Sequence, residues 1–379
     1  MEKDIRHAGF DVDSEKIAVA VAEPSGEVRS LGAIPYTAEA VHRLVKRLGP
    51  AKRLKVCYEA GPHGYGLYRQ LSKLGVHCDV IAPTLVPVKS GDRVKTNRRD
   101  AEKLARCYRS GDLTPVWVPD AAHEGLRDLV RAREAAKKDQ LRARHRLGKF
   151  LLRRGLRGAA GVRSWTTKHL RWVKTLHFEV PAQEATFLDY LHEVEHAAER
   201  VVRLERAIDQ AIESASVEIR ALTAGLQALR GIRQVSAATI VAEVGPLSRF
   251  PRPKQLMGYS GMVSSEDSTG SSVRRGAITK TGNAHVRRVV GEAAWAYQHR
   301  PSMSPMLKKR QEGLSEEVKE IAWKAQHRLC SRYRRLMGKG KVRQKVVTAI
   351  GRELLGFIWA IGVQVESEVR STKKRSRAA

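Results

Sequence analysis

The feature that most constrains the fold of this chain is a single acidic residue inside an apolar segment near the N-terminus. In residues 7–21, HAGFDVDSEKIAVAV, Asp11 interrupts an apolar run, and the alternating residues 16–21 predict a strand. A lone carboxylate in such a place is ordinarily a turn residue or an ion-pair partner. Two more acids occupy comparable places, because Glu59 closes the apolar strand 54–60 and Asp100 opens a predicted helix. We therefore expect the three carboxylates to converge.

Residues 1–120 are predicted to form an α/β domain around a mixed sheet. Strands are expected at 27–34, 54–60 and 77–82, and helices at 37–48 and 64–74. Acids at strand ends gather at one edge of such a sheet, where sites are usually found. Converging carboxylates suggest Mg²⁺, which prefers hard oxygen ligands, and a basic surrounding field would admit a polyanion.

The charge balance indicates a polyanionic partner. The chain has 70 Lys and Arg against 40 Asp and Glu, a net charge of +30. Nucleic acid is the first interpretation and an anionic membrane surface the competing one. No apolar run approaches the roughly 18–20 residues of a spanning helix, and the N-terminus lacks a signal-peptide core. We expect a soluble, cytoplasmic, nucleoid-associated protein with no membrane partner.

Two long helices are predicted in residues 121–218. The first is basic, with twelve Lys or Arg against three Asp or Glu between residues 127 and 157, where a balanced solvated face would carry compensating acids. The second, residues 182–214, spaces apolar residues by threes and fours, as in a coiled-coil seam. It could pair with the basic helix or form a dimer. The residues predicted to contact nucleic acid on the first helix are Arg131, Lys138, Arg142 and Arg146.

Residues 219–365 are predicted to form a mainly α-helical domain. Within it, residues 229–245 resemble a helix-hairpin-helix, which offers backbone N–H groups to phosphates without reading bases. Residues 366–379 are predicted to be a basic, disordered tail. The tryptophans, Trp165, Trp172 and Trp323 among them, are interpreted as packing anchors, with base stacking by one exposed ring as the alternative.

A Ser/Gly-rich stretch at residues 258–282 is the second candidate for chemistry. Ser268 and Thr269 offer hydroxyl groups, and a hydroxyl that attacks phosphorus needs cations to neutralise the phosphoryl oxygens. Composition alone also fits a polar loop that only binds phosphate. The nearby cations predicted to contact nucleic acid are Arg274, Arg275 and Lys280.

Several motifs resemble a bacterial insertion-sequence transposase family related to the Piv invertases. These are Asp11, CYEAGPHGYGLYRQL around Glu59, KTNRRDAEKLA around Asp100, LRGIRQVSAATIVAEVG, and RFPRPKQLMGYSGMVSSEDSTG with ITKTGN. The resemblance covers nearly the whole chain. It implies a RuvC-like (RNase H-like) DEDD domain, a connecting coiled coil and a C-terminal domain with a catalytic serine.

The resemblance also implies a mechanism and partners. The acids would bind Mg²⁺, with Mn²⁺ as a substitute, and the serine would form a covalent link to DNA. Donor DNA, target DNA and a structured guide RNA from the same element are the implied partners, with assembly as a dimer or tetramer. The alternatives are a hydrolytic RuvC-like nuclease and a non-catalytic nucleic-acid binder.

Two positions depart from the family pattern. Asn97 stands where the family has its third acid, so it would be an uncharged fourth ligand, and Asp13 or Asp92 could supply the missing charge. Thr269 stands immediately before Gly270, where the family has its serine. Ser268 is the less hindered hydroxyl, whereas strict spacing favours Thr269, and both stay candidates.

Overall fold

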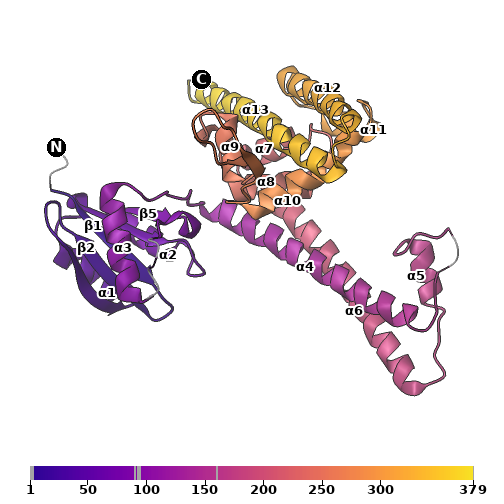
Figure 1. Cartoon of the computed structure of the whole chain (residues 1–379), viewed down its shortest axis with the longest axis horizontal. Coiled ribbons are helices and arrows are strands. Elements are labelled where there is room, and N and C mark those ends of the chain that lie inside the picture. The colour runs from indigo at the N-terminus through magenta and orange to yellow at the C-terminus, as the bar shows by residue number, and fades with distance from the viewer. Residues whose placement is uncertain (1–3, 89–90, 92–94, 159–160, 379) are drawn as a thin grey trace. The chain divides into compact units, whose positions relative to one another are not determined.

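The computed structural model describes residues 4–88, 91, 95–158 and 161–378. It divides the chain into two compact units, Met1–Val118 and Pro119–Ala379 (Figure 1). The second unit contains both regions, 121–218 and 219–365, that the sequence predicted as separate domains.

The first unit is built on a five-stranded mixed sheet in the order β3-β2-β1-β4-β5. Strands β1, β2 and β3 form an antiparallel meander, while β4 pairs parallel to β1 and β5 parallel to β4. The acidic segment that opens the chain is thus two strands joined by a turn at residues 13–15. The strands are β1 (Arg6–Val12), β2 (Lys16–Ala22), β3 (Val28–Pro35), β4 (Leu54–Glu59) and β5 (His77–Ile81).

The two faces of this sheet carry side chains of different size. Large apolar residues such as Phe10 and Tyr58 pack on one face with helices α1 (Ala38–Leu48) and α2 (Gly66–Lys73). The other face carries small residues, among them Gly9 and Ala20, and is covered by α3 (Asn97–Ser110). Single 3₁₀ turns occur at Ala51–Arg53 and Pro83–Leu85. The predicted α/β character is confirmed, and the small residues explain how closely α3 approaches.

A long helical hairpin opens the second unit. Helix α4 (Ala121–Leu152) begins at Asp120, whose side chain accepts a 2.8 Å hydrogen bond from the backbone N–H of His123. It packs along α6 (Pro181–Glu213), with the short helix α5 (Thr167–Val173) beside the far end of the pair (Figure 1). The predicted seam therefore pairs with the basic helix of the same chain. Its buried residues at the far end are Ala143, Leu147, Phe150, Leu151, Phe187, Leu191 and Val194.

The rest of the second unit is mainly helical and shares one large core. In the described part of this unit, β6 (Ser264–Glu266) and β7 (Arg275–Ile278) form a two-stranded antiparallel hairpin. The sequence predicted only a polar loop there. The helices are α7 (Val217–Leu226), α8 (Gln234–Val244), α9 (Pro253–Tyr259), α10 (Ala284–Ala294), α11 (Pro305–Arg310), α12 (Glu316–Gly338) and α13 (Arg343–Ala378), with 3₁₀ turns at Leu247–Arg249 and Trp295–Gln298.

Helix α13 corrects the expectation of a disordered tail, because residues 366–378 continue this helix. Glu366 accepts hydrogen bonds from the backbone N–H groups of Leu247 and Ser248 at 2.5 and 3.0 Å, and Glu368 accepts one from Ser315 at 2.7 Å. These contacts anchor the segment that composition alone marked as unstructured. By length and hydropathy α13 could cross a membrane, but half of its apolar window is buried inside the unit, as in the central helix of a folded domain.

Candidate active site

The first two carboxylates lie side by side at the ends of adjacent parallel strands. In the β1–β4 ladder Phe10 pairs with Tyr58, so the next residues, Asp11 and Glu59, occupy neighbouring positions. Neighbouring strands are about 4.8 Å apart, and residues in register on parallel strands share a face of the sheet. The two side chains therefore project together on the face covered by α3.

A glycine brings the third carboxylate to the same place. A Cβ on Gly9 would overlap the backbone carbonyl of Ala101 and the backbone amide of Ala105, so only glycine lets α3 lie this close to β1. Gly9 and Asp11 face the same way because side chains alternate along a strand. Asp100 directly precedes Ala101 in the first turn of α3. The predicted convergence of the three acids thus has a structural basis.

The electrostatics of the three carboxylates are dominated by burial and by repulsion between like charges. Burial raises the pKa of Asp11, and repulsion from Asp100 raises it further. Burial likewise raises the pKa of Glu59, with repulsion from Asp100 and Asp11 adding to it. Lys95 lies close enough to oppose both shifts. Within the described ranges, none of the three carboxylates accepts a hydrogen bond or forms an ion pair, so their charge is left for a cation or a proton.

The described side chains do not by themselves form a metal site. Among the described residues, no group of three or more His, Cys, Asp or Glu side chains could hold a metal ion. Mg²⁺ is usually bound by one or two carboxylates together with water and substrate phosphate, and binding of Mg²⁺ by these acids stays a prediction. Asn97 is the first residue of α3, one turn before Asp100. Asp13 adds to the repulsion on Asp11, while Asp92 lies outside the described residues.

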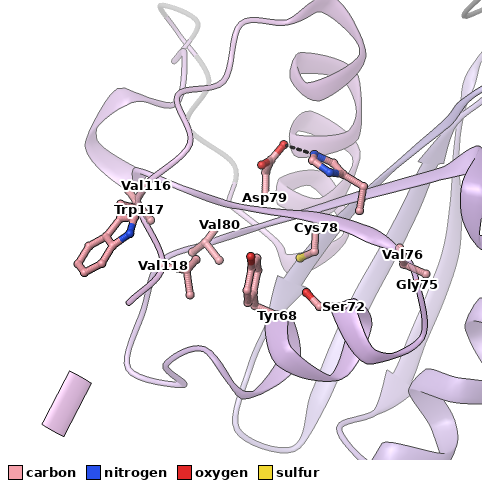
Figure 2. A pocket seen from close by; sticks show the side chains of 11 residues that line it. Tyr68, Ser72, Gly75, Val76, Cys78, Asp79, Val80, Val116, Trp117 and Val118 are labelled. Carbon is pink, nitrogen blue, oxygen red and sulfur yellow. Dashed lines mark hydrogen bonds and ion pairs between the residues drawn. The ribbon is translucent and has the colours of Figure 1, made fainter. Parts of the chain in front are cut away.

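The first unit also contains a pocket that is separate from the three carboxylates. It has a volume of about 720 Å³ and is lined by β5, α2 and the segment around Trp117 (Figure 2). Asp79 is the acid in this pocket, and it accepts hydrogen bonds from Tyr108 at 2.7 Å and shares a 3.1 Å contact with His77. None of Asp11, Glu59 and Asp100 lines it. Its acid is already satisfied by these two partners, so we assign the chemistry to the three carboxylates instead.

The second candidate site is the exposed tip of the β6–β7 hairpin. Thr269 and Ser272 exchange backbone hydrogen bonds of 3.0 Å across a two-residue turn, and Gly270 takes the positive φ of 57° that the first position of such a turn requires. Ser268 directly precedes this turn, and both candidate hydroxyls are exposed. The hairpin thus presents them at a defined place instead of in a flexible loop.

Only one of the two hydroxyls contacts a carboxylate. Ser268 Oγ donates a 3.0 Å hydrogen bond to Glu266 Oε1, and Arg275 Nε lies 3.3 Å from the other oxygen of Glu266. No side-chain hydrogen bond of Thr269 occurs in the described structure. Serine, carboxylate and arginine therefore form a chain of contacts, in which Glu266 is positioned to accept the proton of Ser268.

A buried acid organises the segment that follows the hairpin. Glu243 of α8 is 1% exposed and binds Arg131 through two hydrogen bonds, of 2.7 and 2.9 Å. Asn283 also donates to Glu243, at 2.8 Å, and its own carbonyl oxygen caps α10 by accepting from Val286 at 2.9 Å. Although burial alone would raise it, these donors hold the pKa of Glu243 below its usual value. The ITKTGN motif therefore joins the hairpin to α10 through Asn283.

Most of the predicted nucleic-acid contacts already have a partner in the chain. Arg131 binds Glu243, Lys138 lies 2.8 Å from Glu134, and Arg146 makes two hydrogen bonds to Glu193. Arg142 pairs with Asp139, and Arg275 with Glu266. Arg274 and Lys280 form no ion pair within the described residues. Apart from the contact of Arg131 with the buried Glu243, these ion pairs are exposed and exchange readily, so their cations can still meet a phosphate; the role of all of them stays a prediction.

The helix-hairpin-helix prediction also stays open. Helices α7 and α8 flank a turn that contains Gly231 at a φ of 86°. A Cβ on Gly231 would overlap the carbonyl of Ala293 at the end of α10. This glycine therefore has a packing function, whether or not the turn also meets a phosphate.

Sequence reasoning missed three features of this region: Glu266, Asn283, and a contact between Glu134 and His285. Glu266 lies two residues before Ser268, but nothing in the pattern predicted a hairpin to bring them together. Asn283 could have been found, because an Asn directly before a helical segment is a capping signal. The link between Glu134 and His285, with Nδ1 2.7 Å from Oε2, spans 151 positions and has no local signal.

Comparisons with known proteins place the chain among transposases. The model of the transposase IS116/IS110/IS902 family matches residues 224–308, and a DEDD-type transposase model of the IS110 group matches residues 8–154. The first match contains Ser268, Thr269 and Asn283, and the second contains Asp11, Glu59 and Asp100.

Three similar proteins cover between 72% and 93% of this chain. A "Putative transposase y4qE" of Sinorhizobium fredii is 45% identical over 93% of this chain and 87% of its own length. The transposase for insertion sequence element IS1533 of Leptospira borgpetersenii is 30% identical over 88% of this chain and 97% of its own. A pilin gene-inverting protein of Moraxella bovis is 21% identical over 72% of this chain and 67% of its own. The chain therefore belongs to the IS110/IS116 family of insertion-sequence transposases.

Proposed function

We propose that this transposase cuts and rejoins DNA through a covalent link between Ser268 and a DNA phosphate. The observation that carries the proposal is the 3.0 Å hydrogen bond from Ser268 Oγ to Glu266. In the cutting step the serine oxygen bonds to phosphorus, the bond from phosphorus to the departing strand breaks, and the hydroxyl proton passes to Glu266. The departing oxygen takes a proton from water. Arg274 and Arg275 follow Ser268 closely in the same hairpin, and their positive charges would neutralise the phosphoryl oxygens.

Rejoining is the reverse displacement. The hydroxyl end of another strand attacks the same phosphorus and loses its proton to solvent. The serine oxygen leaves and recovers a proton from Glu266. Because a phosphodiester is exchanged for a phosphodiester, the bond energy is preserved and no external energy source is needed.

We propose that Asp11, Glu59 and Asp100 hold Mg²⁺, with Mn²⁺ as a substitute and Asn97 as an uncharged additional ligand. Support comes from the raised pKa of Asp11 and of Glu59 and from the missing partners of all three acids in the described structure. A bound divalent ion would neutralise charge on the substrate phosphate. The strand order β3-β2-β1-β4-β5, with its antiparallel meander and parallel β4 and β5, supports a RuvC-like fold for this unit.

The partners that we propose are supported by the charge of the chain and by exposed apolar side chains. The net charge of +30 suits donor DNA, target DNA and a structured guide RNA held together. Leu141 on α4 and Val202 on α6 are 54% and 46% exposed, on a hairpin whose seam is already filled. These side chains support assembly of the chain as a dimer or tetramer.

The test is to incubate the protein with its flanking RNA, labelled donor DNA and Mg²⁺, denature the mixture, and look for label on the protein. We expect an adduct that is lost in Ser268→Ala and kept in Thr269→Ala. The reverse outcome would move the nucleophile to Thr269. Cut DNA without an adduct would replace the proposal with a hydrolytic nuclease, and binding without cutting would mean that Asn97 marks an inactive site.

A further inference from the structure

The far end of the α4–α6 hairpin carries a pocket that none of the functions above uses. It has a volume of about 310 Å³, within the 300–1,000 Å³ usual for small-ligand sites, and an adjoining hollow shares Arg144, Ser164 and Trp165 with it. Its walls come from the end of α4, from α5 and from the segment before α5. The pocket therefore lies entirely within the second unit.

Trp165 occupies this pocket in a strained backbone conformation. Its φ is 65°, a value that bulky side chains rarely adopt, and such outliers gather at functional sites. The strain holds the half-buried indole over α4, where a Cβ on Gly148 would lie 3.6 Å from the ring. The guanidinium carbon of Arg144 lies 5.6 Å from the centre of the same ring. One surface thus combines an aromatic ring with a stacked cation.

Two further aromatic rings continue the wall. The ring centres of Trp165 and His169 are 5.5 Å apart, and those of His169 and Trp172 are 5.4 Å apart. His169 is 7% exposed, and its Nδ1 has no hydrogen-bond partner among the described residues. Buried polar atoms are normally satisfied, so this one points to a missing ligand or water.

The charge around the pocket is unlike that on the rest of α4. Arg144, Lys149, Arg157 and Arg163 line the two hollows, and no described lining residue is Asp or Glu. None of these four cations forms an ion pair within the described ranges, whereas Arg131, Lys138, Arg142 and Arg146 each do. An unscreened cluster of cations around an aromatic ring matches the chemistry of a nucleotide, with its flat base and its phosphates.

We propose that this pocket binds an unpaired nucleotide of an RNA or DNA strand, with the base stacked on Trp165 and the flanking phosphates on Lys149 and Arg163. A duplex cannot enter, because its bases are stacked and paired inside the helix. The site is separate from the carboxylates and from Ser268, so it does not depend on the mechanism proposed for cutting.

The test measures binding of the full chain in EDTA, where no strand is cut. The probes are a labelled oligouridylate, an oligothymidylate of equal length and a blunt DNA duplex. We expect Trp165→Ala to weaken binding of single strands about tenfold or more, the effect of removing a stacking ring, and to change duplex binding less than twofold. Lys149→Ala should weaken binding of the same strands. A preference for one of the two single-stranded probes would show whether the source is RNA or displaced DNA.

Three control variants separate stacking from charge and folding. Trp165→Phe keeps a ring and should retain most of the affinity. Trp323→Ala removes a 41% exposed ring on α12, and Lys168→Ala removes an exposed cation of α5 outside the pocket, and neither should change binding. Unchanged single-strand binding in Trp165→Ala, or an equal loss for duplex and single strands, would overturn the proposal.

A second measurement needs no variant that might misfold. Photo-crosslinking of the unmodified protein to bromouridine-containing RNA and to bromodeoxyuridine-containing single-stranded DNA, followed by peptide mapping, should label the peptide that contains Trp165. Crosslinks confined to other peptides would overturn the proposal even if every variant bound weakly.

Discussion

Gly9 of β1 lies against the backbone of Ala101 of α3, closer than any residue with a Cβ could approach. This contact sets the depth at which α3 crosses the sheet, and therefore where Asp100 lies relative to Asp11. A residue with no chemistry of its own thus positions two proposed metal ligands.

The first prediction concerns Gly9→Ala. The added methyl group would overlap backbone atoms of α3, which cannot rotate away as a side chain could, so the helix must shift. We expect a loss of about 1–3 kcal/mol in the unfolding free energy of the first unit, measured by thermal or urea unfolding, and a larger loss of DNA cutting.

Gly66→Ala is the matched control, because a Cβ there would lie 4.0 Å from the Tyr36 hydroxyl, an ordinary contact. It should leave stability and cutting nearly unchanged. Full cutting activity in a folded Gly9→Ala variant would contradict the positioning role of this glycine.

The second prediction concerns Asp11→Asn in the absence of divalent metal. Because burial and the neighbouring acids raise the pKa of Asp11, its ionised form destabilises the folded unit. The charge-free variant should therefore be more stable at neutral pH by about 1 kcal/mol, read as a melting temperature a few degrees higher, while cutting is lost.

The sign of the pH dependence follows from the raised pKa. The folded unit holds the proton at a higher pH than the unfolded chain, so the wild type loses stability as the pH rises through that pKa. The advantage of Asp11→Asn should shrink as the pH falls. Mg²⁺ should raise the melting temperature of the wild type and of the control Glu27→Gln, an exposed acid, more than that of Asp11→Asn. Equal Mg²⁺ responses would remove Asp11 from the proposed metal site.

The third prediction concerns Glu266→Gln. The amide oxygen can still accept the hydrogen bond from Ser268, but it cannot take the proton, so adduct formation should slow by about 10²–10⁴-fold while DNA binding stays unchanged. Single-turnover labelling of the protein measures the rate. Asp267→Asn, which removes a neighbouring exposed acid, should retain the wild-type rate. If Glu266→Gln also retains it, the proton leaves by another route.

The fourth prediction concerns Arg131→Ala. Among the described residues, removing this partner leaves the carboxylate of Glu243, 1% exposed, with Arg127 and Asn283, so the second unit should lose about 2–3 kcal/mol of unfolding free energy. Arg142→Ala breaks an exposed pair with Asp139 and should cost less than about 0.5 kcal/mol. Equal small effects would show that the buried contact contributes little.

Acid unfolding gives a separate measure of the same contact. The pKa of Glu243 is held low in the folded unit, so its contribution to stability is present above the ordinary value of 4.5 and is lost as the pH falls through the folded pKa. Arg131→Ala should flatten this part of the stability curve. Partial recovery in the double variant Arg131→Met with Glu243→Gln would confirm that the cost comes from the uncompensated charge.

Local patterns predicted the elements well where one face of an element is buried. A helix was expected at residues 37–48, and α1 begins after Thr37, whose hydroxyl accepts a hydrogen bond from the N–H of Ala40 at 3.2 Å. A seam was expected in residues 182–214, and Phe187, Leu191 and Val194 are buried against α4. Periodicity captured these features because it reports burial directly.

Contacts between distant segments could not be predicted in the same way. Leu141 and Leu152 of α4 are apolar, yet their side chains are 54% and 46% exposed, because α6 covers only part of that helix. A strand was expected at residues 16–21, and the structure adds a second one, β1, before the turn at residues 13–15. The hairpin around Ser268 and the ion pairs of α4 depend on partners far away in sequence, as does the continuation of α13.

The α4–α6 hairpin would set the length of any nucleic-acid strand that is bound at both ends of the hairpin. Glu134 joins α4 to α10 through His285, and Gly148 lies beneath Trp165. These positions are 14 residues apart on one continuous helix, which corresponds to about 21 Å at 1.5 Å per residue. That length matches about six nucleotides of a stacked strand at 3.4 Å each. The length of the hairpin therefore fixes the distance between these two positions. Removing whole turns from both of its helices would shorten that distance without changing either end.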